Sequence, residues 1–278
     1  MAQRPADADA PEFGKIVSPS SRWAEIVADG VDWDVPDADT GRIAAAKAFP
    51  STGVYFILQY RVPVWSSRRY GTAVHPHGNR RHMATRVQSG IVTAWGDGPV
   101  GAVILRLRPE AAVRLLGQHL QDFADTKIGL GDIFGDRKIA LLEERIAEAP
   151  CRAARFAHML GFLADNMLER EPDALVCRAA TLLRRRPALR VSRVAAALGM
   201  SERSLSRKFQ AMFGMSPKHF ARTARVEKAL MARRGGASWA DVAHACGFAD
   251  QAHMIRDFND ILGASPEQAM RPTVAAAA

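Results

Sequence analysis

The stretches GMSERSLSRKFQAMFGMSP, which begins at Gly199, and GFADQAHMIRDFNDILGASP, which begins at Gly247, decide the fold because they repeat one pattern. With one extra residue after the second glycine, Phe209 aligns with Phe258, and both copies end in Gly-x-Ser-Pro. A short helical pattern of small residues precedes each glycine. Helix, glycine turn and second amphipathic helix form the outline of a helix-turn-helix. A helical solenoid also repeats at such periods, but two copies are too few for one.

The residues around the two copies predict further helices. Residues 174–185 and 192–198 show helical periodicity, and Ser201 is placed to cap the helix that follows Gly199. Proline at position 217 and the glycine pair at 235–236 bound a spacer helix between the copies. A helix of some 18 residues is roughly 27 Å long. That length holds two recognition helices near one turn of DNA apart, about 34 Å.

Each predicted second helix has an apolar and a polar face. In the first copy Leu205, Phe209, Met212 and Phe213 form the inward stripe, and in the second copy Met254, Phe258, Ile261 and Leu262 do so. The opposite faces present Arg203, Arg207 and Gln210 in the first copy, and Ala252, Arg256 and Asn259 in the second, with Gln251 and His253 nearer the start of that helix.

Charge is distributed unevenly along the chain. Residues 175–278 contain 17 Lys and Arg against 7 Asp and Glu, whereas residues 1–174 contain 21 against 22. The whole net charge of +9 therefore comes from the half that carries the repeat. A basic segment built of helix-turn-helix units is typical of a DNA-binding domain, because phosphate neutralisation supplies the sequence-independent part of the affinity. The alternative is a solvated basic surface on a helical bundle.

Length and composition constrain the rest of the chain. At 278 residues and 48% hydrophobic content, two domains are expected. The three cysteines are scattered without metal-ligand spacing and are expected to be reduced. The N-terminus has no apolar run typical of a signal peptide or membrane span, so we expect a cytoplasmic protein without membrane contact. Residues 1–12 and 273–278 are expected to be disordered tails.

Residues 175–271 resemble the DNA-binding domain of the AraC family of bacterial transcription regulators. Ala-Ala-Leu-Gly-Met-Ser and Gly-Met-Ser-Pro in the first motif, and Ala-Cys-Gly-Phe and Gly-Ala-Ser-Pro in the second, carry the resemblance. It implies a seven-helix domain whose two motifs enter adjacent major grooves. By position, the expected DNA-contacting residues are Arg203, Ser206, Arg207, Gln210, Gln251, Ala252, His253 and Arg256, and the expected phosphate contacts are Arg190, Ser201, Lys208 and Lys218.

The candidates differ in what they can read. Arg207 is the strongest candidate for base recognition, by a bidentate contact to guanine, with a phosphate contact as the alternative. Relatives often carry a hydrogen-bonding side chain at the position of Ala252. Alanine can contact only a thymine methyl group, so the second motif is expected to read sequence less sharply.

The N-terminal half predicts strands followed by helices. Residues 53–64 read as a strand, and residues 86–95 and 100–106 flank Gly-Asp-Gly-Pro and read as a hairpin. Helices are expected after Pro109, over 139–146 and over 152–168. The expected fold is α+β: a small β-barrel-like sheet followed by helices, plus an all-α C-terminal domain with two helix-turn-helix motifs joined by a spacer helix. The stretch from Leu107 to Gly117, with Ile-Phe-Gly at 133–135, resembles the N-terminal regions of some AraC-type regulators.

Candidate sites in the N-terminal half are less specific. Phe56, Tyr60, Trp65 and Trp95 could line an effector pocket, although aromatic side chains on strands more often form plain core. His75, His77 and His82 lie in HPHGNRRH, which reads as a polar loop rather than a metal site. Phosphate-loop, nucleophile-elbow and paired Cys-His motifs are missing, so the sequence predicts no enzyme, no metal and no cofactor.

The sequence therefore predicts a DNA-binding transcription regulator, in the first place an activator. Residues 13–170 are expected to form a sensory or dimerisation domain that binds a small-molecule effector, and residues 171–272 the DNA-binding domain. Expected partners are double-stranded DNA, the effector, RNA polymerase and a second copy of the chain. The alternatives are an N-terminal domain that binds a protein partner or only dimerises, or an enzyme fused to a DNA-binding domain.

Overall fold

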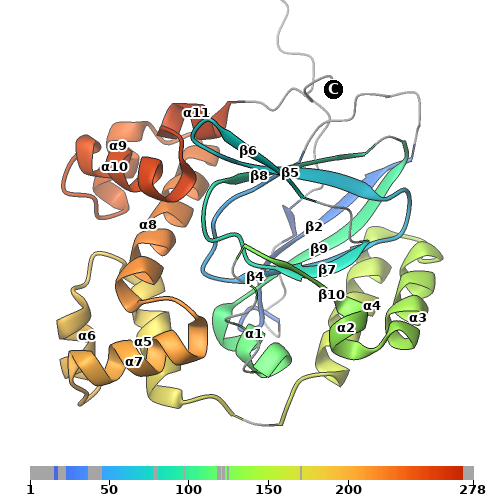
Figure 1. Ribbon diagram of the computed structural model, residues 1–278, viewed down its shortest axis with the longest axis horizontal. Helices are drawn as coiled ribbons and strands as arrows, with labels where there is room; N and C mark the ends of the chain where they lie inside the picture. The colour runs from blue at the N-terminus through green and yellow to red at the C-terminus, as the bar shows by residue number, and fades with distance from the viewer. Residues whose placement is uncertain are drawn as a thin grey trace, which may run out of the picture.

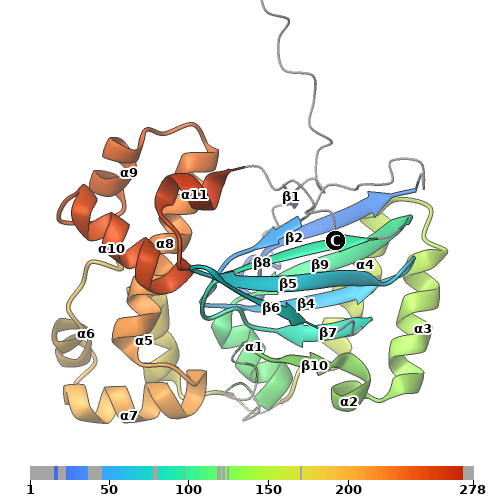
Figure 2. The same cartoon turned by 45° about the horizontal axis from the view of Figure 1, so that its top comes forward.

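Two antiparallel sheets face each other, and helices cover one of them and one end of both (Figures 1 and 2). The computed structural model describes residues 16–17, 23–36, 46–77, 81–96, 98–117, 120, 123, 125–169 and 171–271. The α+β class with a helical C-terminal region is confirmed. Both predicted tails lie outside the described residues.

The larger sheet has six strands in the order β1–β2–β9–β4–β7–β10. Its strands are β1 (Ile16–Val17), β2 (Val27–Val35), β9 (Val100–Leu107), β4 (Val54–Gln59), β7 (His82–Thr85) and β10 (Lys127–Gly129). The smaller sheet has the order β3–β8–β5–β6, with β3 (Ala46–Ala48), β8 (Ile91–Gly96), β5 (Val64–Tyr70) and β6 (Ala73–His77). In β4, Val54, Phe56 and Leu58 are fully buried on the helix-covered face, as the period of two requires.

Two strand predictions differ from the structure, one in its extent and one in its pairing. The stretch 53–64 is not one strand: it contains the whole of β4, a turn and the first residue of β5 in the other sheet. Pro63 has no amide hydrogen to donate within this turn. The next amide, that of Val64, donates to the side-chain oxygen of Gln59 at 2.8 Å. The buried Gln59 thus stabilises the crossing between the sheets.

The expected hairpin is also a crossing between sheets. β8 pairs with β3 and β5, whereas β9 pairs with β2 and β4. The second segment is a strand as predicted, the first is one only from Ile91 onward, and the two do not pair with each other. Neighbouring strands joined by a glycine-rich turn favour a hairpin, and the non-local partners that override this preference leave no mark on the local sequence.

The described part of the N-terminal half has four helices, of which the first lies between β9 and β10 and the other three follow β10. They are α1 (Pro109–Leu116), α2 (Leu130–Phe134), α3 (Asp136–Ala147) and α4 (Arg152–Asp165). The three predicted helices are confirmed as α1, α3 and α4, and α4 ends three residues before its predicted end. Apolar side chains of these helices, such as Leu115 and Leu163, pack under the larger sheet.

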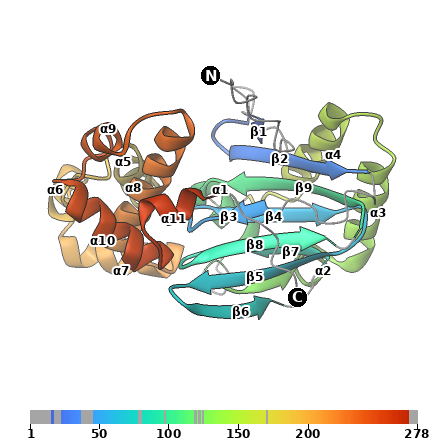
Figure 3. The same cartoon turned by 90° about the horizontal axis from the view of Figure 1, so that it is seen from above.

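The remaining helices gather at one end of the sheets, opposite the end near α3 (Figure 3). They are α5 (Ala174–Arg185), α6 (Val191–Ala197), α7 (Glu202–Phe213), α8 (Pro217–Arg234), α9 (Trp239–Ala245), α10 (Gln251–Leu262) and α11 (Pro266–Met270). The predicted helix–turn–helix order and the spacer helix α8 are confirmed.

Two hydrophobic clusters join the halves of the chain. The first runs without interruption from the larger sheet and α1 into α5, α7 and the start of α8, where Phe209, Phe213 and Phe220 are fully buried. The second lies among α8, α9, α10 and α11 and includes Phe49, in the loop after β3, and Ile91 of β8. Each helix-turn-helix motif therefore shares its apolar core with the N-terminal half.

Candidate nucleic-acid interface

The first motif consists of α6, a turn at Gly199 and α7. Gly199 has φ of 66°, which an L side chain rarely adopts. The Ser201 hydroxyl accepts a hydrogen bond from the Ser204 amide at 3.1 Å, so Ser201 caps α7 as predicted. Leu205 is buried on the inner side of α7, whereas Arg203 and Arg207 are exposed on its outer side.

The polar face of α7 is exposed to solvent and accessible to a ligand. Gln210 is exposed beside Arg203 and Arg207, and Ser206 is half-buried. Within the described part of the chain, neither arginine forms an ion pair. Two unpaired guanidinium groups one turn apart on a helix surface suit contact with DNA phosphates or base edges.

The second motif repeats this geometry with α9, Gly247 and α10. Gly247 has φ of 78°, and the Asp250 carboxylate caps α10 by accepting from the His253 amide at 2.6 Å. Gln251, Ala252 and Arg256 are exposed, as their positions predicted. The outer face of α10 carries one arginine where that of α7 carries two.

The side chain of His253 is occupied within the second motif. Its Nδ1 accepts from the Ala249 amide at 3.2 Å, and its Nε2 lies 3.3 Å from the Arg225 guanidinium. The ring also packs edge-on against Phe248, with 5.7 Å between centroids. His253 therefore holds the turn between α9 and α10, which limits its freedom to contact a base.

A buried carboxylate that sequence analysis missed ties α10 to α8. Asp257 is 3% exposed and accepts from the Arg222 guanidinium at 2.8 Å, and Arg225 lies 3.7 Å from its second oxygen. Burial lowers the pKa of Arg225, and the charge of Asp257 opposes that shift. The sequence does contain a signal for this contact, because Asp257 directly precedes Phe258 of the apolar stripe. A carboxylate buried there requires a charged or hydrogen-bonding partner.

The four residues expected to contact phosphates differ in their exposure and in whether they already have partners within the protein. Arg190 and Lys218 are exposed. The Ser201 hydroxyl oxygen accepts the capping bond, which leaves its proton to donate to a phosphate, and the Lys208 ammonium lies 2.8 Å from Asp173. The hydrogen bond from Lys208 is the main cause that lowers the pKa of Asp173. Lys208 must leave this exposed pair to reach a phosphate, which costs about 1 kcal/mol or less.

The four aromatic candidates for an effector pocket lie in separate environments. Phe56 is fully buried against Phe134, with 5.9 Å between centroids. Tyr60 is buried and donates to Asp32, whereas Trp65 is 45% exposed and pairs across strands with Trp95. The structure does not bring these rings together around one cavity, because Phe56 faces the helices and Trp65 faces solvent.

The three histidines also differ from their expected setting. His75 and His77 belong to strand β6 rather than to a loop, although residues 78–80 lie outside the described residues. His82 lies on β7, where its Nε2 is 2.9 Å from Glu143 and its Nδ1 accepts from the Gln59 amide at 3.3 Å. Among the described residues, no group of three His, Cys, Asp or Glu side chains could hold a metal ion.

A cavity of about 220 Å³ lies between the larger sheet, the start of α1 and helices α5 and α8. Arg106, Arg108, Arg184, Glu227 and Lys228 provide its charged lining. Arg106 and Arg184 are paired with carboxylates. Arg108 and Lys228 instead donate to the backbone carbonyls of Ala24 and Arg185. Burial, and then the charge of Arg184, lower the pKa of Arg108. The cavity wall thus has positive charge that an anion would stabilise.

Residues 176–271 match the family described as helix-turn-helix domain. A Streptomyces antibioticus protein named as an AraC-like transcription regulator is 32% identical over 113 residues, which are 36% of this chain and 37% of that protein. The chain thus spans little more than a third of the length of this curated relative.

The solved structures that match share little sequence with this chain. ToxT from Vibrio cholerae matches with a TM-score of 0.47 and 10% identity, over 81% of this chain and 97% of ToxT. The C-terminal domain of AraT, a response regulator from Geobacillus stearothermophilus, matches with a TM-score of 0.35 and 23% identity, over 39% of this chain and 95% of that domain. Within the described residues, the helices are too short or too polar to cross a membrane.

Proposed function

Because residues 176–271 form an AraC-type helix-turn-helix domain, we propose that this chain is a sequence-specific transcription regulator that reads two adjacent major grooves of double-stranded DNA. The observation that carries this proposal is the repeated geometry. Two capped helices, α7 and α10, each follow a left-handed glycine turn and present an exposed polar face, while their apolar faces are buried. Helix α8 joins the two motifs.

Within this proposal, the exposed residues take different roles. Arg203, Ser206, Arg207 and Gln210 form the reading face of α7, and Gln251, Ala252 and Arg256 form that of α10. His253 acts mainly as a structural residue of the second motif, because its Nδ1 accepts from the Ala249 amide and its ring packs against Phe248. Arg190 and Lys218 contact phosphates, with Lys208 and Ser201 as weaker contributors. DNA recognition by the first motif is therefore the stronger of the two.

We assign residues 13–170 to a sensory or dimerisation domain and residues 171–272 to the DNA-binding domain. The cavity of about 220 Å³ is the best-supported site for a small effector, and Arg108 and Lys228 favour an anionic one. We also propose that the chain activates transcription through contact with RNA polymerase and that it forms a homodimer. An N-terminal half that binds a protein partner remains the second candidate, since α3 exposes Leu141 on its surface.

The proposal predicts a defined DNA site and a steep dependence on salt. The full chain, used to enrich random duplexes, should return a consensus with two half-sites about 10 base pairs apart. If it neutralises about six phosphates, its affinity should fall on the order of 10³-fold between 50 and 200 mM salt. Fluorescence anisotropy over that range measures the slope. Enrichment that yields no consensus, together with weak binding at low salt, would contradict sequence-specific DNA binding.

The domain assignment predicts where the DNA affinity lies. A fragment of residues 170–278 should bind the selected duplex, and a fragment of residues 1–169 should not, because the net positive charge and both motifs belong to the former. The 170–278 fragment should also unfold at a lower temperature than the full chain, since the cut exposes apolar surface that Phe49 and Ile91 cover. DNA affinity in the 1–169 fragment would overturn the assignment.

A further inference from the structure

The C-terminal end of α10 is capped by the smaller sheet. The last carbonyl groups of a helix lack partners within the helix and carry partial negative charge. Here the Tyr70 hydroxyl donates to the Asp260 carbonyl at 2.9 Å, and the Gly90 amide donates to the Ile261 carbonyl at 2.9 Å. The Gly71 amide donates to the carbonyl of Gly263 at 3.1 Å. Three donors from two loops of the smaller sheet therefore hold the end of the second recognition helix.

The N-terminal half of the chain also binds the C-terminal end of α7. The Arg86 guanidinium, which is fully buried, donates to the Phe213 carbonyl. Burial lowers the pKa of Arg86 to about 10, so the side chain remains charged at neutral pH. Both recognition helices thus end in the same way: a left-handed glycine, Gly214 or Gly263, follows the helix, and donors from the N-terminal half satisfy its last carbonyl groups.

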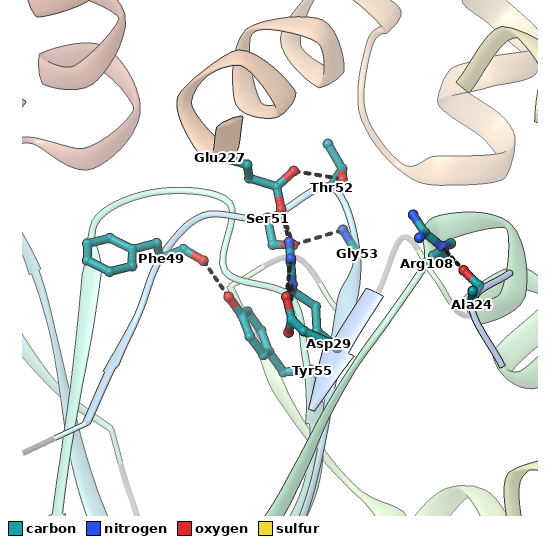
Figure 4. A network of polar contacts seen from close by, with 10 residues as sticks. Ala24, Asp29, Phe49, Ser51, Thr52, Gly53, Tyr55, Arg108 and Glu227 are labelled. Atoms are coloured by element: carbon teal, nitrogen blue, oxygen red, sulfur yellow. Dashed lines mark hydrogen bonds and ion pairs between the residues drawn. The ribbon is translucent and has the colours of Figure 1, made fainter. Parts of the chain in front are cut away.

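A third attachment lies between the two motifs, at the middle of α8 (Figure 4). The Glu227 carboxylate accepts from the Ser51 and Thr52 hydroxyls, each at 2.8 Å, and from the Arg106 guanidinium. Ser51 and Thr52 are buried, and Arg106 is held in turn by Asp29. The loop that carries these hydroxyls also places Phe49 in the core of the second motif. Polar and apolar contacts therefore fix the same segment of the spacer helix.

These attachments leave the proposed reading faces open. Arg203, Arg207, Gln251 and Arg256 are exposed in the docked arrangement, because the attachments lie at the ends of α7 and α10 and on α8. A contact that blocked DNA would cover these faces. Three attachments on three different helices instead restrict how far one motif can move relative to the other.

We propose that the N-terminal half is a brace that fixes the spacing of the two recognition helices, and that Glu227 and Tyr70 are positioning residues for DNA recognition. The brace consists of residues Ser51, Thr52, Tyr70, Gly71, Arg86, Gly90 and Arg106. This inference rests on the proposed DNA-binding function and adds to it. Helix α8 limits the greatest distance between the motifs, and the brace adds selectivity among spacings that differ by one or two base pairs.

The test compares the affinity of the full chain for duplexes that differ only in half-site spacing. The selected duplex is changed by −1, +1 and +2 base pairs between the half-sites, and affinities are measured for the wild type, Tyr70→Phe, Glu227→Gln and the double variant. The wild type should prefer the best spacing on the order of tenfold, a typical size for coupling between sites. The double variant should prefer it less than about threefold, because one motif can then move to follow the DNA.

Matched controls separate positioning from general stability. Glu143→Gln breaks the ion pairs of Glu143 with Arg81 and His82, which do not touch a recognition helix, and should keep the wild-type preference. Thermal melts establish that each variant is folded. Tyr70→Phe retains the ring at a site that is 41% exposed, so it tests the brace even if the double variant fails to fold.

Each outcome bears on a defined claim. A wild type that binds no DNA contradicts the proposed function itself. A wild type that binds without a spacing preference, or brace variants that keep the full preference, overturns the brace. Brace variants that bind every spacing equally more tightly also overturn it, because that result identifies the contacts as inhibitory.

Discussion

Inserting about 5 base pairs between the two half-sites is expected to abolish most of the contribution of the second motif. Half a helical turn places the second half-site on the opposite side of the duplex, beyond the reach of α10. Each well-made base contact contributes about 1–3 kcal/mol, so the loss of a whole motif should lower the affinity by on the order of tenfold or more. Gel-shift titration of the full chain on the selected and inserted duplexes measures the loss.

Two further duplexes make this prediction specific. Replacing the base pairs between the half-sites without changing their number should leave the affinity nearly unchanged. Inserting about 10 base pairs returns the second half-site to the same side of the duplex as the first but increases the distance between them. Full affinity should not return, because α8 cannot lengthen. Equal binding to all four duplexes would mean that the motifs act as independent modules on a flexible connection.

Replacing Arg207 with alanine is expected to weaken binding to the selected site by about 1–3 kcal/mol, roughly 5- to 150-fold, and to relax the preference at one base pair. Arg207 is exposed on α7 and forms no ion pair with a described residue, so stability should change by less than about 0.5 kcal/mol. Repeating the site selection with the variant identifies the base pair concerned.

Arg190→Ala provides the matched control. Arg190 is exposed at the start of α6, and as a phosphate contact it should weaken binding to all sequences alike and leave the consensus unchanged. An unchanged consensus for Arg207→Ala as well would exclude Arg207 from base recognition and assign it to the phosphate contacts.

Much of the C-terminal region could be predicted because its signals are local. A capping serine at 201, a left-handed glycine at 199 and an apolar residue every third or fourth position each act within one or two turns of helix. Residues 174–185 and 217–234 were therefore assigned to helices with their observed bounds. The exposed faces of α7 and α10 follow from the same periodicity.

Contacts across the chain decided what local signals could not. The sequence around Gly96 to Val100 is that of a hairpin, yet β8 and β9 separate into two sheets because each has better partners elsewhere. His253 is expected to contact DNA by position, yet the fold also gives it a structural contact: its Nδ1 accepts from the Ala249 amide and its ring packs against Phe248. A side chain with two hydrogen-bonding atoms takes whichever partners the tertiary fold brings within reach.

The sequence by itself determined the two motifs, their spacer helix and the basic charge, because each depends on side chains close together in the chain. Only the tertiary structure decided that Glu227 would lie against Ser51 and Thr52, more than 170 residues away. Nothing in the periodicity of α8 distinguishes Glu227 from a solvated glutamate. The difference arises because folding buries its carboxylate, and a buried charge must find donors wherever the opposing surface supplies them.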